Sequence, residues 1–255
     1  MLAFVPDEAK RILDEAKKRG ITLRLLGGVA VKYHCPSASH RTLQRTYPDL
    51  DFFGHKKQGR EIRKLLTDLG YQPEQRFNAL HGDTRLIYED PVNQRVADIF
   101  LDLFKMCHTL ELGKRLELDD YTITISDLLL TKLQVVEINE KDVRDLIAIL
   151  HDHPVEQSIA EGEKERIDAD YIAGLCAEEW GLCTTITLTL KKIPGFFPKY
   201  ELTEQDRGIV MERIDLLLRA IDAVPKSFKW RLRAKVGEKK RWYDLPEVPI
   251  RTQQV

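Results

Sequence analysis

Two aspartates stand one residue apart in the stretch Asp49-Leu50-Asp51-Phe52-Phe53. Alternate residues of a β-strand point to the same face, so a strand here would bring both carboxylates to one place. Carboxylate oxygens are the hard ligands that divalent cations such as Mg²⁺ prefer. The pair therefore predicts a metal site, although Pro48-Asp49 is also typical of a turn, where the acids would need no metal.

A third aspartate, Asp98, interrupts the apolar run Val96-Ala97-Asp98-Ile99-Phe100-Leu101. A charged side chain inside a core strand is normally paired or bound to a metal. The alternative to a metal is an ion pair with an arginine such as Arg95. Three carboxylates on neighbouring strands would suit two-metal phosphoryl chemistry, in which the metals hold the attacking and leaving oxygens.

The apolar run Ile21 to Leu26 stops at Gly27-Gly28, and a helix is predicted to follow from Val29. Two glycines at such a turn let backbone N–H groups approach a ligand closely, and the helix N-terminus favours a phosphate. A double glycine is also common in plain turns. Its value lies in the order of strand, glycines, helix and then the strands that carry the aspartates.

The elements that must position these residues follow from apolar periodicity. Helices are predicted where apolar residues recur every three to four positions, at 6–19 and 60–69. Strands are predicted at 21–26, 49–53, 85–88 and 95–103, and the polar stretch 34–48 is interpreted as a loop. This alternation predicts an α/β (α+β) core, a mixed sheet with flanking helices.

Beyond residue 110 the pattern becomes mainly helical. Helices are predicted at 126–136, 139–150, 166–180 and 203–224, several of them opening on a capping residue. The β-branched run 184–190 could be a strand, but its place between helices favours a helix. We therefore expect a catalytic domain at 1–112, a helical domain at 113–225 and a basic aromatic tail at 226–255.

Three motifs together resemble a known superfamily: Leu26-Gly27-Gly28-Val29-Ala30, the run from Arg45 to Phe53, and Val96-Ala97-Asp98-Ile99-Phe100. They are similar to the signature of the nucleotidyltransferases with a polymerase-β-like fold, and most like the abortive-infection type IV toxins. The stretches 126–133 and 141–145 also resemble the helix pair that follows the catalytic core in that group. The resemblance covers roughly residues 20 to 150.

The resemblance implies a role for each matching residue. Gly27 and Gly28 would hold the triphosphate, and Asp49 and Asp51 would bind Mg²⁺. Asp98 would complete the metal site and help to deprotonate the acceptor hydroxyl. Arg45 occupies the place of a basic residue typical of the family, and Lys132 would reach a nucleotide phosphate. Judged without the family, Lys132 is a solvated lysine on an amphipathic helix.

The implied activity is a Mg²⁺-dependent transfer of a nucleoside monophosphate from an NTP such as ATP to a hydroxyl of RNA or tRNA, of a protein or of a small molecule. A toxin of this kind would also have an antitoxin partner. The alternative is a non-catalytic nucleotide- or RNA-binding module on the same fold. It would bind without turnover, but it gives no physical reason to keep three clustered acids.

The segment 226–243 is strongly basic, with only Glu238 as an acidic residue, and its aromatic residues are interleaved with the basic ones. Basic side chains beside stacking aromatic rings are typical of surfaces that bind single-stranded nucleic acid, so RNA is a possible partner. The alternative is a segment that packs across the protein with its charges solvated. The acidic stretch 156–170 could then be its counterpart.

The charge of the whole chain is nearly balanced, unlike that of this segment. The chain has 255 residues, of which 43% are hydrophobic and 32% charged, and its 40 basic and 41 acidic residues nearly balance. The total charge therefore indicates no particular partner. Four cysteines without a C-x-x-C pair suit the cytosol, and Met106-Cys107-His108 is interpreted as a strand end rather than a metal site. We see no leader sequence and no membrane-spanning run, so we expect a cytoplasmic protein without a membrane partner.

Overall fold

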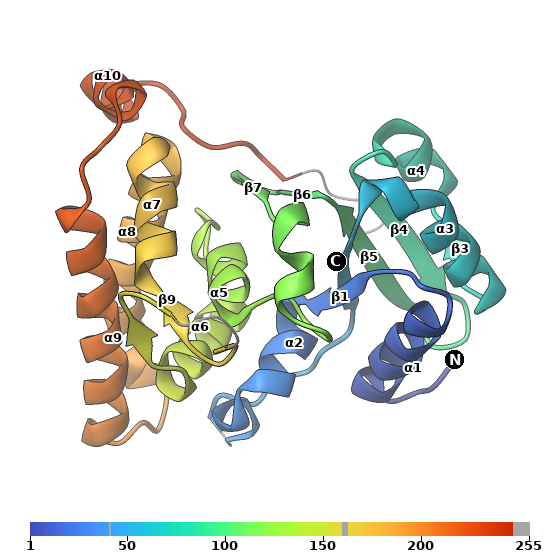
Figure 1. Cartoon of the computed structure of the whole chain (residues 1–255). Helices are drawn as coiled ribbons and strands as arrows, with labels where there is room; N and C mark the ends of the chain where they lie inside the picture. The colour runs from blue at the N-terminus through green and yellow to red at the C-terminus, as the bar shows by residue number, and fades with distance from the viewer. Residues whose placement is uncertain (41, 160–162, 247–255) are drawn as a thin grey trace.

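The computed structural model describes residues 1–40, 42–159 and 163–246. At its centre lies a five-stranded sheet with the order β1-β2-β5-β4-β3 (Figure 1). The strands are β1 (Leu23–Leu26), β2 (Leu50–Gly54), β3 (Gln72–Pro73), β4 (Arg85–Asp90) and β5 (Arg95–Leu101). β2 and β5 run parallel, whereas the other neighbours are antiparallel. The predicted mixed sheet is confirmed.

Helices pack against this sheet where their apolar residues require it. They are α1 (Val5–Lys18), α2 (Gly27–His34), α3 (Gly59–Asp68) and α4 (Gln75–His81). In α1, Ile12, Leu13 and Ala16 are buried at helical spacing, and the chain leaves the helix through Gly20, whose φ is +69°. The sequence predicts that the helix begins at Val29, after the glycine pair. In the structure Gly27 and Gly28 are instead the first two residues of α2.

The second half of the chain is mainly helical, as predicted. Its helices are α5 (Ile125–Leu133), α6 (Glu140–Asp152), α7 (Ala169–Glu178), α8 (Trp180–Lys192) and α9 (Glu204–Ala223), with the short strands β8 (Val155–Glu156) and β9 (Ile167–Asp168). The side chains of Thr124, Asn139 and Thr203 cap α5, α6 and α9. The run 184–190 lies within α8, so the preference for a helix there is confirmed.

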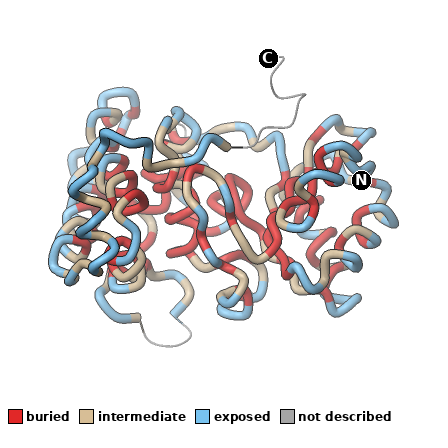
Figure 2. Tube along the Cα trace, turned by 90° about the horizontal axis from the view of Figure 1, so that it is seen from above, coloured by how far each residue is buried: buried red, intermediate tan, exposed pale blue. Residues whose placement is uncertain are grey.

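The two halves share one buried core. α2 lies between the sheet and the helices α5 and α6 (Figure 1). The backbone of Leu25 in β1 also bonds to Tyr121 and Ile123, in the segment that leads into α5. Figure 2 shows buried residues running through both halves, with exposed residues around them. The first turn of α2 is therefore held from both sides.

Some predicted elements need correction. The strand predicted at 95–103 is broken at Asp102, which has a φ of +58°, and the chain continues as the hairpin β6 (Leu103–Lys105) and β7 (Thr109–Glu111). The predicted loop 34–48 contains a 3-10 turn, Pro36–Ser39. The segment 226–255 is not an irregular tail throughout, because it forms α10 (Phe228–Val236). The residues 247–255 lie outside the described part.

Candidate active site

The predicted aspartates come together on two neighbouring strands, β2 and β5. In the register of the sheet, Asp51 lies opposite Leu26 of β1 on one side and opposite Asp98 of β5 on the other. Residues opposite one another on paired strands share a face, so Asp51 and Asp98 are side by side. Asp49 lies just before β2, and its carboxylate accepts a hydrogen bond from the backbone of Val96. We call Asp49, Asp51 and Asp98 the aspartate row.

The carboxylate of Asp51 rests on the backbone of Gly27. A Cβ atom at Gly27 would overlap with Asp51 Oδ2, and the φ of +68° at Gly27 is one that other residues rarely adopt. Burial, and next the nearby Asp98 carboxylate, raise the pKa of Asp51 to about 7. No described residue makes a hydrogen bond or an ion pair with the Asp51 carboxylate. Asp51 is therefore the acid of the aspartate row whose negative charge a bound cation would stabilise.

Asp98 has an arginine partner, but it is Arg85 rather than Arg95. Arg85 Nε lies 2.9 Å from Asp98 Oδ1, and Arg85 Nη2 lies 2.5 Å from Asp98 Oδ2. Arg85 stands opposite Phe100, two residues beyond Asp98, and therefore shares its face. Arg95 is three residues from Asp98, so it points to the other face.

Arg95 has a different acid as its partner. It lies opposite Asp90 and bonds to it at 2.8 Å, which closes the β4–β5 hairpin. The residue pairing of this hairpin is the signal in the sequence that could have identified Arg85 as the partner of Asp98.

Arg45 lies across the first turn of α2. Its guanidinium occupies the space in which a Cβ of Gly28 would lie, and it stands 4.5 Å from the ring centroid of Tyr47. Arg45 Nε and Nη2 donate to the two carboxylate oxygens of Asp145, at 2.8 and 2.7 Å. Gly28 is thus needed here for the close approach of an arginine as well as for any phosphate.

Lys132 belongs to the same group of charges. Its Nζ lies 2.9 Å from Asp145 Oδ2 and 3.0 Å from Asp142 Oδ1. Burial by itself would lower the pKa of Lys132, but the two carboxylates raise it, so the lysine stays protonated. Lys132 is therefore neither isolated nor solvated. We call Arg45, Lys132, Asp142 and Asp145 the Asp145 cluster; sequence reasoning named its two basic members and missed the acid that joins them.

Two of the three aspartates suit a magnesium ion. Within the described ranges, no three His, Cys, Asp or Glu side chains are arranged to hold a metal by themselves. Mg²⁺ in proteins commonly takes one or two carboxylates and keeps water or substrate oxygens as its other ligands. Asp49 and Asp51 supply such a pair, and the cradle of Gly27 keeps Asp51 in place. Asp98, by contrast, is held by Arg85.

A protein-family model described as "uncharacterised nucleotidyltransferase" matches residues 4–151, which include the aspartate row and the Asp145 cluster. The chain belongs to this nucleotidyltransferase family. It is thus an enzyme of the class that transfers nucleoside monophosphates, as the sequence motifs predict. The closer likeness to abortive-infection toxins stays a prediction.

Comparison with individual proteins adds little detail. Among solved structures, the lincosamide antibiotic adenylyltransferase LnuA, in its lincomycin-bound crystal structure, is similar to this nucleotidyltransferase. The two share 18% sequence identity with a TM-score of 0.41, over 55% of this chain and 92% of LnuA. No curated protein matches the chain.

Two other sequence hypotheses are placed by the structure. Residues 106–108 form the turn of the β6–β7 hairpin, where His108 Nε2 lies 2.8 Å from Thr185 Oγ1. Beyond α10 the chain packs back on this hairpin, because the backbone N–H of Asp244 donates to Cys107. RNA binding by 226–243 stays a prediction. None of the helices in the described ranges is long and apolar enough to cross a membrane.

Proposed function

We propose that this nucleotidyltransferase transfers a nucleoside monophosphate from an NTP to a hydroxyl acceptor in a Mg²⁺-dependent reaction. The acceptor oxygen forms a bond to the α-phosphorus, the bond from that phosphorus to the bridging oxygen breaks, and pyrophosphate leaves. One observation carries the proposal: Asp51, between Gly27 and Asp98, is partly buried and has no partner among the described residues. A carboxylate in that position is costly unless a cation joins it.

Asp49 and Asp51 are the residues that would hold the metal. When bound, Mg²⁺ supplies positive charge that neutralises the phosphate oxygens of the nucleotide. Asp51 is positioned for this by the register of β1 and β2, and Asp49 by its bond from the backbone of Val96. Asp98 would accept the proton of the acceptor hydroxyl, with Arg85 fixing the orientation of its carboxylate.

The triphosphate would lie at the start of α2. Backbone N–H groups in the first turn of a helix have no partner inside the helix, and they favour an anion. Arg45 lies over Gly28 at this turn, and Lys132 shares Asp145 with it. The two basic side chains are thus already oriented, so binding of a phosphate would lose little side-chain entropy.

The experiment is transfer of label from each of the four α-labelled NTPs in the presence of Mg²⁺. The acceptors tested are RNA including tRNA, proteins and small hydroxyl compounds. We expect transfer to one acceptor class with the natural protein and a loss of at least about a hundredfold in Asp49→Asn/Asp51→Asn. Asp83→Asn is the control, because that aspartate is exposed and bound only to Lys56 among the described residues.

Transfer that is unchanged in the double variant would contradict the proposal. A binding-only protein predicts a different pattern, in which an NTP binds in a calorimetric titration but no pyrophosphate is released with any acceptor. Release above background that depends on Asp49 and Asp51 would exclude the binding-only alternative.

A further inference from the structure

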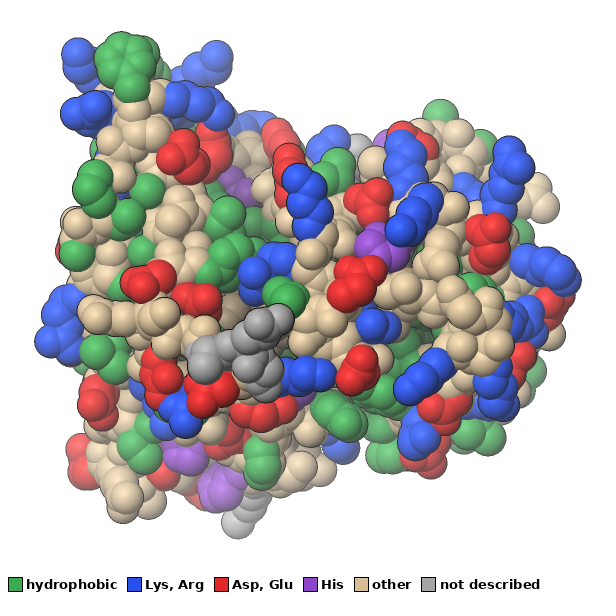
Figure 3. All heavy atoms as spheres, in the orientation of Figure 1, with side chains coloured by type: hydrophobic (Ala, Val, Ile, Leu, Met, Phe, Trp, Pro, Cys, Tyr) green, Lys and Arg blue, Asp and Glu red, His purple; other side chains and the backbone are tan. Residues whose placement is uncertain are grey.

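The segment from Lys226 to Arg241 carries eight basic residues and one acid, although the chain as a whole has a net charge of -1. Much of this charge lies on α10, which has no buried residue. α10 lies at a corner of the molecule (Figure 1), and it is far in sequence from the aspartate row. In Figure 3 a hydrophobic side chain protrudes at this corner, and Lys and Arg side chains lie on both sides of it.

α10 has apolar residues on two sides, of which one packs against the protein and the other is exposed. Trp230 packs against the core and Ala234, one turn later, is half-buried. Phe228, Leu232 and Val236 are also four residues apart, and they are 70%, 47% and 43% exposed. At 100° per residue these three lie roughly opposite the packed side of the helix. We call Phe228, Leu232 and Val236 the Phe228 stripe.

Basic residues flank the stripe on both sides. By helical spacing, Arg231 and Lys235 lie along one edge, and Lys229 and Arg233 lie along the other. Lys229 pairs with Glu179 at 2.7 Å, which is an exposed contact. Among the described residues, Arg231 and Lys235 have no ion-pair partner. An occupant of this surface must therefore be apolar at its middle and negatively charged around it.

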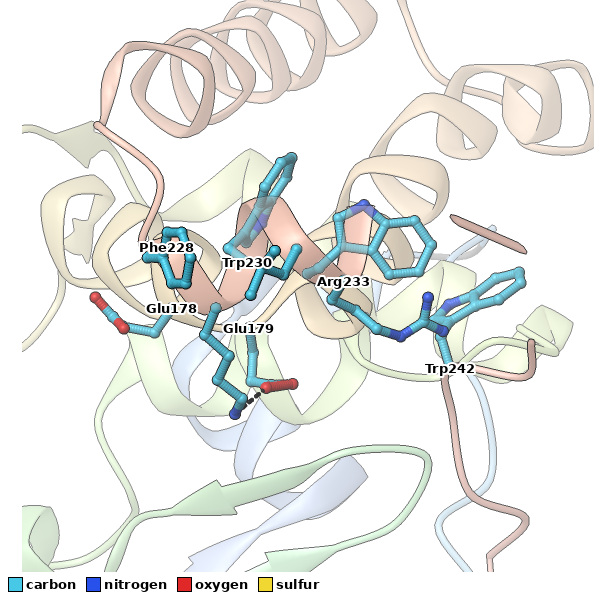
Figure 4. A pocket seen from close by; sticks show the side chains of 10 residues that line it. Glu178, Glu179, Phe228, Trp230, Arg233 and Trp242 are labelled. Carbon is cyan, nitrogen blue, oxygen red and sulfur yellow. Dashed lines mark hydrogen bonds and ion pairs between the residues drawn. The ribbon is translucent and has the colours of Figure 1, made fainter. Parts of the chain in front are cut away.

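The cavity beside α10 does not suit a nucleic acid base. It has a volume of about 440 Å³ and is lined by all three tryptophans of the chain, Trp180, Trp230 and Trp242 (Figure 4). Arg233 lies 4.6 Å from the ring centroid of Trp180, and the indole N–H of Trp242 donates to Thr185. The rings of Trp180 and Trp242 are thus already engaged. Phe228 and Leu232 also line this cavity, whereas Val236 does not, so a base held there would leave the aliphatic Val236 uncovered.

A second copy of the chain is also a poor occupant. Two copies of α10 facing each other would bring their basic edges together, and like charges at such an interface oppose association. A lipid surface has the required chemistry, because its acyl region accepts a convex apolar stripe and its headgroups can carry negative charge. Helices with basic residues on one face and Phe or Leu side chains on another bind membrane interfaces in this way.

We propose that α10 docks this protein on the surface of an anionic lipid bilayer. The Phe228 stripe enters the boundary between headgroups and acyl chains, and Arg231, Lys235 and the following basic residues contact the headgroup phosphates. With nine residues α10 is about 13 Å long, too short to span a bilayer, so it lies on the surface. The docking is independent of nucleotide transfer and does not use the aspartate row.

The test is flotation of the full-length protein with vesicles of phosphatidylcholine containing 30% phosphatidylglycerol. Vesicles of pure phosphatidylcholine and a single-stranded oligouridylate serve as the competing probes. We expect flotation with the anionic vesicles that falls with added salt. Because Trp230 belongs to α10 and Trp180 and Trp242 lie beside it, vesicles with brominated acyl chains should quench most of the tryptophan fluorescence.

Two variants separate the parts of the surface. Phe228→Ser/Leu232→Ser should abolish quenching by brominated lipid, and Arg231→Glu/Lys235→Glu should lower the fraction of bound protein by at least about tenfold. The control is Lys57→Glu/Leu80→Ser, which changes the same residue types at exposed sites on the catalytic half. All four α10 side chains are exposed, so the folded structure should persist in circular dichroism.

Three results would overturn the proposal. The first is the absence of flotation with anionic vesicles at low salt. The second is binding of the oligouridylate, competed by neither vesicle, with no quenching by brominated lipid. The third is equal flotation of the α10 variants and the control variant. Loss of nucleotide transfer has no bearing on this test, so its failure and that of the proposed activity can be distinguished.

Discussion

Asp51 and Asp145 both lie near the first turn of α2, and their surroundings differ. Asp145 is bound by Arg45 and Lys132. Burial alone would raise the pKa of Asp145, but the two basic residues lower it. Asp51 has no such partner among the described residues, and its pKa rises to about 7. Asp145 forms part of the folded structure, whereas Asp51 is suited to a cation that the described residues do not supply.

The largest change in the free energy of unfolding is expected from substitution of Asp145, the carboxylate that has basic partners. Asp145→Asn leaves Arg45 and Lys132 with a neutral partner in a buried place, so we expect the free energy of unfolding to fall by about 3–5 kcal/mol. Urea unfolding followed by circular dichroism measures it. The exposed Asp83→Asn should change the same quantity by less than about 0.5 kcal/mol. Equal effects of the two substitutions would remove the distinction between Asp145 and an ordinary surface acid.

The next effect separates backbone strain from the contact with Asp51. Gly27→Ala and Gly20→Ala both place a side chain on a residue with φ near +68°. At Gly20 nothing lies within 4 Å of the added Cβ, whereas at Gly27 it would overlap with Asp51. We expect a loss of about 1 kcal/mol for Gly20→Ala and about 2–4 kcal/mol for Gly27→Ala. Similar losses in urea unfolding would contradict the close packing of Asp51 on Gly27.

Substitution of Asp51 should raise the free energy of unfolding, whereas the substitutions above lower it. Without metal at pH 8, Asp51→Asn removes a carboxylate whose ionisation is disfavoured, so the free energy of unfolding should rise by roughly 1–3 kcal/mol. The gain depends on pH. Between about pH 4 and pH 7 the native protein keeps the Asp51 proton that the unfolded chain loses, so rising pH destabilises the natural protein relative to the variant. A gap that does not grow with pH, in unfolding curves at pH 4.5 and pH 8, would count against the unpaired carboxylate.

His108, which is remote in sequence from Asp51 and Asp145, should make the free energy of unfolding depend on pH in the opposite direction. Burial lowers the pKa of His108 to about 4, so the neutral ring is favoured beside Thr185. As pH falls from about 6.5 to 4, His108 binds a proton in the unfolded chain but stays neutral in the native protein. We therefore expect the natural protein to lose about 1–2 kcal/mol over this range relative to His108→Gln. Parallel unfolding curves for the two proteins would contradict a neutral buried His108.

The sequence predicts the aspartate row better than it predicts the Asp145 cluster. Asp51 and Asp98 are each set by a local pattern, because strand alternation and an apolar run decide which way they point. Arg45 and Asp145 are 100 residues apart in sequence, and no local pattern brings them together. Arg85 is an intermediate case, because its contact with Asp98 follows from the pairing of β4 with β5 within one hairpin.

The sequence does not predict α10, for a different physical reason. Sequence periodicity identifies helices by an apolar side that faces the core, but three of the helix-spaced apolar residues of α10, the Phe228 stripe, are exposed instead. Its basic and aromatic composition was visible in the sequence, but the direction of the Phe228 stripe was not. Only the packing of Trp230 against the rest of the protein shows which side is free.

Asp51 is the proposed cation ligand, and calorimetric titration of the protein with Mg²⁺ at pH 8 and pH 6 tests this role most directly. We predict binding at pH 8 that weakens by about tenfold at pH 6, because the proton on Asp51 must first leave. Binding should persist in Asp83→Asn and disappear in Asp51→Asn. Equal Mg²⁺ affinity in the natural protein and in Asp51→Asn would contradict the account.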